Sequence, residues 1–202
     1  MIAWGIVVAA GAGVRFGGDK HRARLGGREL WQWGRESLLA GGAAGVTVVG
    51  PVPGGVPGGV RRRDSVAAGL AAVPAHADAV LVHDAARPLA TAQLVARVLD
   101  RLAAGDAPGV VPVIPLRDTI KETDDATVVR TLDRDRLVAV QTPQGFRASV
   151  LREAHAEDEE DATDDALLLE RRNHRVVTVN GEPWNLKVTF PEDLRVLEAL
   201  LS

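Results

Sequence analysis

The chain has 202 residues, of which 46% are hydrophobic and 25% charged, a balance typical of a globular domain long enough to bury a core. The net charge of -3 argues against a dedicated nucleic-acid binder, because such domains usually carry a strong basic excess. The absence of cysteine excludes disulfides and thiolate metal sites. No apolar run has the roughly 18 residues of a membrane span, and no signal peptide is recognisable, so we expect a cytoplasmic protein with no membrane or nucleic-acid partner.

Apolar runs typical of strands alternate with segments typical of helices along almost the whole chain. The strand-like runs are Ile2–Ala9, Val46–Gly50, Ala79–Val82, Gly109–Ile114, Val138–Val140 and Val176–Val179. The helical segments are Arg28–Ala40, Asp64–Ala72, Thr91–Ala104, Ala148–Ala156, Asp164–Arg172 and Pro191–Leu201. Several strand runs are continuous in Val, Ile and Leu, as expected of parallel strands covered on both faces. The pattern predicts a doubly wound α/β domain with a mostly parallel sheet.

Two segments interrupt this alternation. Gly50–Gly59 is rich in proline and glycine, so we expect a loop. Pro115–Arg136 is rich in charge and threonine and is too long for an ordinary connection. We expect it to be a functional or partner-contacting excursion in which Thr127–Thr131 forms one strand of a small hairpin. At the start of the last helix, Thr189 and Glu192 predict a capping box with proline in the first turn.

A glycine-rich loop, Ala9-Ala10-Gly11-Ala12-Gly13-Val14-Arg15-Phe16-Gly17-Gly18-Asp19-Lys20, follows the first strand. Glycines there let the backbone approach a ligand, and N–H groups at a strand's end attract phosphate. Arg15 and Lys20 add two positive charges where a polyphosphate would lie. A dinucleotide-binding turn is a rival interpretation, but the second strand ends in Val49-Gly50-Pro51 without the required acidic residue. The loop also lacks the Gly-Lys-Ser/Thr order of a Walker A motif. A plain turn that carries surface cations remains an alternative interpretation.

Polar residues also follow the other strands, at the sheet edge where ligands of α/β proteins bind. Asp84 is a candidate ligand for Mg²⁺ on a triphosphate, or a turn cap. Arg87 is a candidate for pairing with a phosphate, or braces its loop through carbonyl groups. Arg61, Arg62 and Arg63 stand at a helix start, where cations are unfavourable, so at least one needs a partner. We expect Arg61 and Arg63 to lie on a solvated face.

Six motifs stand in order along the chain. They are Ala9-Ala10-Gly11-x-Gly13-x-Arg15, Gly58-Gly59-x-x-Arg62-x-x-Ser65-Val66, Val82-His83-Asp84-Ala85-Ala86-Arg87-Pro88, Gln141-Thr142-Pro143-Gln144, Thr163-Asp164-Asp165 and Leu186-Lys187-Val188-Thr189-x-Pro191-Glu192-Asp193. With these motifs the chain resembles the 2-C-methyl-D-erythritol 4-phosphate cytidylyltransferases of the non-mevalonate route to isoprenoids. The resemblance covers essentially the whole sequence.

The resemblance implies a single Rossmann-like nucleotidyltransferase domain over residues 1–202. It implies a protruding β-arm at about 115–136 that is exchanged between the subunits of a homodimer. The implied reaction joins CTP and 2-C-methyl-D-erythritol 4-phosphate, giving CDP-methylerythritol and pyrophosphate, with Mg²⁺ or another divalent cation. Such chemistry needs side chains chiefly to position the reactants and to neutralise charge on the α-phosphate.

Site roles follow from the resemblance, motif by motif. The catalytic cations would be Arg15, Lys20 and Lys187. CTP would be bound by Ala9, Ala10, Gly11, Gly13, Gly59, Arg62, Ser65, Asp84 and Ala85, with Asp84 also beside the metal. The sugar phosphate would be bound by Arg87, Thr119, Arg134, Thr142 and Thr163, with Thr119 and Arg134 serving the partner's active site.

Alternatives remain at the acceptor end and for catalysis itself. A sister enzyme that makes CDP-ribitol from ribitol 5-phosphate shares the fold and the CTP site. The complete Ala85-Ala86 pair favours methylerythritol phosphate as the acceptor. Two positions depart from the family pattern. Trp184 stands where the family often has an acidic residue, and Asp19 stands in place of a proline before Lys20. A non-catalytic nucleotide-binding regulator is disfavoured, because a pure binder has no need of three cations at the α-phosphate. A dehydrogenase function is disfavoured, because the second strand does not end in the acidic residue that a dinucleotide-binding motif requires.

Overall fold

The computed structural model of the chain describes residues 1–11, 13, 16–18, 22–157 and 160–201. Its main sheet consists of β1 (Ala3–Val8), β4 (Gly45–Val49), β5 (Ala79–Asp84), β6 (Gly109–Pro115), β9 (Val138–Val140), β10 (Gln144–Arg147) and β11 (Val176–Asn180). The strand order is β11-β6-β10-β5-β1-β4, and β9 pairs with β6. β4, β1 and β5 run parallel, as do β6 and β11, whereas β10 is antiparallel to its two neighbours.

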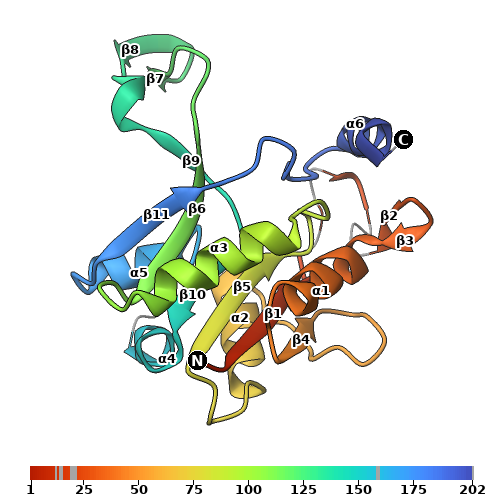
Figure 1. Cartoon of the computed structure of the whole chain (residues 1–202). Coiled ribbons are helices and arrows are strands. Elements are labelled where there is room, and N and C mark those ends of the chain that lie inside the picture. Colours follow the sequence, from red (N-terminus) through yellow and green to blue (C-terminus); the bar gives the residue numbers. More distant parts are fainter. Residues whose placement is uncertain (12, 14–15, 19–21, 158–159, 202) are drawn as a thin grey trace.

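Helices cover both faces of this sheet (Figure 1). α1 (Leu30–Ala40) and α3 (Ala92–Ala103) pack on one face, and α2 (Arg62–Ala71), α4 (Ala148–Glu157) and α5 (Ala166–Arg171) on the other. Along β5, Leu81 belongs to the core under α1 and α3, while Val80 and Val82 belong to the core under α2, α4 and α5. Because both faces are covered, β5 is buried throughout its length. The doubly wound, mostly parallel fold is confirmed.

β10 is a central strand that the sequence analysis did not predict. It has four residues, and the register places its fully buried Phe146 between Val80 of β5 and Gly109 of β6. A glycine at position 145 is required by the packing, because a Cβ there would lie 2.5 Å from Cγ1 of Val98 on α3. The strand therefore depends on tertiary contacts, and its own residues carry no alternating pattern.

The N-terminal cap of α6 (Pro191–Leu201) differs from the predicted capping box. Oδ2 of Asp193 accepts hydrogen bonds from the backbone N–H groups of Thr189 and Phe190, at 2.6 and 2.8 Å. The prediction that Glu192 closes the box was wrong by one residue. The helix begins at Pro191, so Asp193 is the third residue of its first turn, from which a side chain reaches back to the preceding backbone.

α6 belongs to a small cluster at one end of the molecule. Its Leu197 packs with Leu25 of the short hairpin formed by β2 (Arg24–Leu25) and β3 (Arg28–Glu29), with Leu30 of α1, and with Val188. This cluster fixes the segment that precedes α6 next to the start of α1. Lys187 is thereby brought to the edge of the sheet. None of the described helices has both the length and the apolar character that a bilayer crossing requires.

The long excursion between β6 and β9 forms an arm that projects away from the sheet (Figure 1). It contains β7 (Lys121–Asp124), β8 (Thr127–Thr131) and a short 3₁₀ helix (Arg134–Arg136). The predicted strand Thr127–Thr131 is confirmed, and it pairs with β7 in an antiparallel hairpin. Both strands are exposed along their whole length, including Val128 and Val129. A two-stranded hairpin is marginally stable by itself, so this arm has little to hold it within its own chain.

Candidate active site

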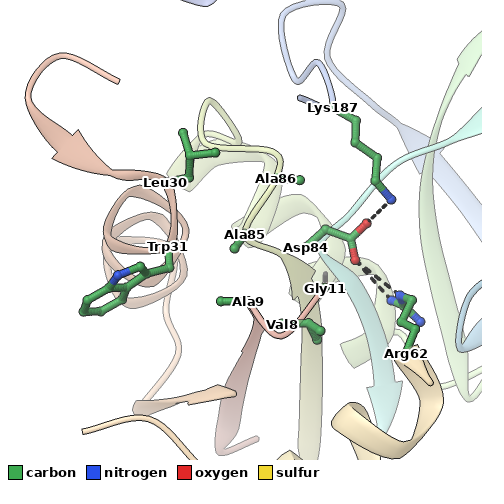
Figure 2. Close-up of a pocket in the computed structure, with 10 residues that line it drawn as sticks. All are labelled: Val8, Ala9, Gly11, Leu30, Trp31, Arg62, Asp84, Ala85, Ala86 and Lys187. Carbon is green, nitrogen blue, oxygen red and sulfur yellow. Dashed lines mark hydrogen bonds and ion pairs between the residues drawn. The ribbon is translucent and has the colours of Figure 1, made fainter. Parts of the chain in front are cut away.

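A pocket of about 200 Å³ opens at the carboxyl ends of β1 and β5 (Figure 2). The last residues of these two strands, Val8 and Asp84, are neighbours in the sheet. This is the edge at which ligands of parallel α/β sheets bind, as the sequence analysis expects. The pocket is lined by Val8, Ala9, Gly11, Leu30, Trp31, Arg62, Asp84, Ala85, Ala86 and Lys187.

Asp84 lies between two cations in this pocket (Figure 2). Its Oδ2 accepts a hydrogen bond from Nζ of Lys187 at 2.6 Å, and its Oδ1 faces Nε and one terminal nitrogen of Arg62, each at 3.4 Å. Burial by itself raises the pKa of Asp84, but the charges of Arg62 and Lys187 outweigh burial and hold that pKa well below its usual range. Asp84 is therefore an ionised carboxylate at neutral pH.

The three consecutive arginines at the start of α2 have three different environments. Arg61 is exposed and pairs with Asp64 at 2.7 Å, and Arg62 joins Asp84 to the buried Asp165, so the expectation of at least one partner is confirmed. The prediction that Arg63 lies on a solvated face was wrong. Arg63 is only 6% exposed and donates to the backbone oxygen of His155 at 2.9 Å, because α2 packs its first turn against α4.

Asp165 and His155 are two residues behind the pocket for which the sequence predicted no role in the site. Asp165 belongs to the motif Thr163-Asp164-Asp165, which by itself predicts no pairing for it, and the pattern around His155 predicts only a helix. The signal that could have found an acidic partner was the arginine run itself, since a cation at a helix N-terminus requires a compensating charge. The sequence carries no further information on which acidic residue supplies it.

The glycine-rich segments close the pocket from two sides. A Cβ at Gly58 would lie 2.4 Å from Cβ of Ala10, so the loop before α2 and the loop after β1 pack tightly against each other. The buried hydroxyl of Ser65 accepts a hydrogen bond from the N–H of Gly59 at 3.1 Å. The N–H of Ala9 donates to the oxygen of Val49 at 2.7 Å. These two N–H groups are thus engaged within the protein.

Two of the three predicted catalytic cations, Arg15 and Lys20, lie outside the described residues. Gly13, between them and β1, has a φ of 62°, in the left-handed region, and its carbonyl accepts from the N–H groups of Phe16 and Gly17. Gly13 is therefore close in space to Phe16 and Gly17.

Thr142 lies behind Asp84, where its hydroxyl both accepts and donates a hydrogen bond within the protein. The hydroxyl accepts from the N–H of Asp84 at 3.1 Å and donates to Nδ1 of the buried His83 at 3.1 Å. Nε2 of His83 lies 3.1 Å from the backbone oxygen of Arg87, and since a carbonyl only accepts, Nε2 carries the proton. This chain of hydrogen bonds fixes the backbone on which Asp84 is carried. This placement makes Thr142 a support for Asp84, and its contact with the sugar phosphate stays a prediction.

His83 makes the stability of the protein pH-dependent in a defined window. Burial lowers the pKa of His83 to about 4, against a partial opposing effect of Asp84, whereas the unfolded chain titrates near 6.5. As the pH falls from 6.5 to 4, His83 binds a proton in the unfolded state but stays neutral in the native state. The free energy of unfolding should therefore decrease by up to about 3 kcal/mol over this window.

Urea denaturation at pH 7, 5.5 and 4.5 measures this decrease. The variant His83→Gln should flatten the dependence, while His76→Gln, which changes an exposed histidine, should retain it. An unchanged slope in His83→Gln would refute the assignment.

Arg87 adopts the second of its two predicted roles. Its terminal nitrogens donate to the backbone oxygens of Asn185 at 2.8 Å and Val140 at 3.1 Å, so it braces the segment that carries Lys187. Thr119 and Arg134 are exposed, and Arg134 donates to the oxygen of Arg117 within the arm. Thr163 is exposed on the loop before α5.

The structure therefore assembles only part of the predicted site within one chain. Six predicted residues line the pocket: Ala9, Gly11, Arg62, Asp84, Ala85 and Lys187. The predicted residues that do not line it are Ala10, Gly13, Gly59, Ser65, Arg87, Thr119, Arg134, Thr142 and Thr163. Leu30 and Trp31 were missed because, at the start of an amphipathic helix, they are indistinguishable from core residues in the sequence.

Comparison with known proteins identifies the family. The family model described as 2-C-methyl-D-erythritol 4-phosphate cytidylyltransferase matches residues 3–202. A bifunctional enzyme IspD/IspF of Nitratidesulfovibrio vulgaris is 58% identical over 71% of this chain and 37% of its own length. A 2-C-methyl-D-erythritol 4-phosphate cytidylyltransferase of Rhodococcus jostii is 45% identical over 98% of this chain and 94% of its own length. The chain spans only 37% to 56% of the bifunctional relatives that it matches.

Solved structures agree with the sequence relatives. The crystal structure of 2-C-methyl-D-erythritol 4-phosphate cytidylyltransferase from Thermus thermophilus is 37% identical, with a TM-score of 0.82 over 97% of each chain. The bifunctional IspDF from Campylobacter jejuni is 26% identical, with a TM-score of 0.84 over 98% of this chain and 55% of that one. The chain therefore belongs to the 2-C-methyl-D-erythritol 4-phosphate cytidylyltransferase family.

Proposed function

We propose that this chain joins CTP and 2-C-methyl-D-erythritol 4-phosphate to give CDP-methylerythritol and pyrophosphate, a step of isoprenoid precursor synthesis. A phosphate oxygen of the acceptor attacks the α-phosphorus of CTP, and the bond from that phosphorus to the bridging oxygen of the β-phosphate breaks. The observation that carries the proposal is the arrangement of Asp84 between Arg62 and Lys187 at the mouth of a pocket bordered by glycine-rich backbone. That arrangement supplies positive charge to a polyphosphate and a carboxylate to a divalent cation.

Lys187 is the cation best placed to act on the reacting phosphorus. Its side chain is 43% exposed, so the ammonium can leave Asp84 and meet a phosphate that enters the pocket. Arg62, whose side chain is 22% exposed, is held from behind and stays beside Asp84. Charges that are in position before the reaction stabilise the five-coordinate phosphorus without reorganisation at the moment of attack. Arg15 and Lys20 would complete this set from the glycine-rich loop.

The residues of the pocket fit a divalent cation that arrives with the nucleotide. Within the described ranges, no group of three or more His, Cys, Asp or Glu side chains is arranged to hold a metal ion. A single carboxylate is sufficient for Mg²⁺ on a triphosphate, because phosphate oxygens and water fill the other positions. Asp84 would hold the ion, which would neutralise phosphate charge when bound.

The arm supports a homodimer with exchanged arms as the working form. Its strands are exposed on all sides, with Val128 and Val129 each more than half exposed. Thr119 and Arg134 do not line the pocket of their own chain. A second subunit would cover the arm and bring these residues to its own pocket. We place the reaction in the cytoplasm, because both substrates are phosphorylated compounds that do not cross membranes unaided.

An assay of pyrophosphate release tests the proposal. We expect turnover with CTP and methylerythritol phosphate, strict dependence on a divalent cation, and a strong preference for CTP over UTP and ATP. Turnover with ribitol 5-phosphate alone would reassign the acceptor, and CTP binding without turnover would favour a regulator. Equal rates with ATP and CTP would count decisively against a cytidylyltransferase.

A further inference from the structure

A set of buried charged and polar groups lies behind the pocket, where α2 meets α4 and α5. Arg62 connects it to the pocket, since one terminal nitrogen donates to Oδ2 of Asp165 at 2.8 Å while two other nitrogens face Asp84 at 3.4 Å. The Asp165 side chain is 1% exposed and does not line the pocket. The shorter, stronger contact of Arg62 is therefore made to a residue outside the pocket.

Asp165 is itself held on its other side. Its Oδ1 lies 3.1 Å from Nε2 of His155, whose side chain is 4% exposed. Burial raises the pKa of Asp165, but the charge of Arg62 and the hydrogen bond from His155 outweigh burial and keep that pKa below its usual range. Asp165 also stands at the N-cap position of α5, so the backbone fixes its location. Both oxygens of an ionised carboxylate are thus committed to holding other groups.

Two neighbouring arginines tie α2 to α4 through the same histidine. Arg62 reaches the His155 side chain through Asp165, and Arg63 donates to the His155 backbone oxygen at 2.9 Å. A partly buried guanidinium at a helix N-terminus needs a dedicated anionic partner. Asp84 cannot serve that purpose alone, because it is shared with Lys187.

We propose that Asp165 and His155 are positioning residues, which keep the guanidinium of Arg62 from closing on Asp84 when a nucleotide draws Lys187 away. Without the Asp165 carboxylate, Arg62 would turn its charge wholly toward Asp84 and compete there with the divalent cation that accompanies CTP. The catalytic consequence rests on the proposed function. The competition at Asp84 is a property of binding and is measurable without turnover.

The isosteric variant Asp165→Asn tests the proposal, because an asparagine has one oxygen for two donors, Arg62 and His155. We expect the Mn²⁺ concentration that half-saturates CTP binding to rise on the order of tenfold, with a similar loss in kcat. Asp164→Asn is the matched control. Asp164 is the adjacent residue, but it accepts from Gln144 at 2.7 Å and from the N–H of Leu167 at 3.1 Å, and it makes no contact with Arg62.

A double-mutant cycle separates positioning from a merely structural role. In an Arg62→Met background, Asp165→Asn should cause no further change in Mn²⁺–CTP affinity, measured by calorimetry. A structural role would lower the melting temperature and the affinity in both backgrounds alike. The inference is overturned if Asp165→Asn binds Mn²⁺–CTP as the wild type does, or if its effect persists without Arg62. Failure of the proposed function would instead appear as wild-type protein that binds CTP but releases no pyrophosphate.

Discussion

Lys187→Ala should lower kcat on the order of a hundredfold while changing the affinity for CTP only slightly. The ammonium of Lys187 is 2.6 Å from Asp84 and faces the pocket, so it lies within reach of a phosphate that enters there. Losing one preorganised charge at a developing five-coordinate phosphorus costs about 3 kcal/mol of transition-state stabilisation. The nucleotide keeps its other contacts, so the loss falls on kcat. Lys20→Ala should behave in the same way.

Steady-state kinetics and CTP titration measure the two effects separately. Arg175→Ala is a suitable control, because it removes an exposed cation that pairs with Asp106, away from the pocket. That variant should keep wild-type kinetics. Near-normal kcat in Lys187→Ala would show that Lys187 serves only as the counterion of Asp84.

The architecture was predictable because parallel strands that are buried on both faces consist of continuous apolar residues, which are visible in the sequence. β5 is covered on both faces, and its apolar run follows directly from that. β10 shows where this reasoning ends. A four-residue strand that contains Gln144 and Gly145 has no periodicity, and its insertion between β5 and β6 is decided by the space that those strands leave. The local sequence pattern does not predict which distant segments pair in the sheet, or in which register.

The candidate site was predictable where a motif and a strand end coincide. Asp84 ends one buried strand and the glycine-rich loop follows its neighbour, so fold and position indicated the same edge of the sheet. The sequence did not predict which side chains pair with one another. Nothing local distinguishes Asp165, which holds Arg62, from Asp164, which holds Gln144. The burial of Arg63 likewise depends on how closely α2 approaches α4.

Mixing two inactive variants should restore activity if the arm is exchanged between subunits. Lys187→Ala disables the pocket of its own chain, and Arg134→Ala disables the arm. In a mixed dimer with exchanged arms, one site carries both defects and the other carries neither. Random mixing makes half of the dimers mixed, each with one intact site, so about a quarter of the wild-type activity should return.

The matched control mixes Lys187→Ala with Asp84→Asn, two defects in the same pocket. Each site of that mixed dimer contains one defective pocket whichever subunit supplies the arm, so activity should stay absent. The contrast between the two mixtures depends only on where Arg134 acts, because all three variants alter polar side chains outside the hydrophobic core. If the Arg134→Ala mixture also stays inactive while mixed dimers are shown to form by mass spectrometry, Arg134 serves its own subunit and the exchanged arm is ruled out.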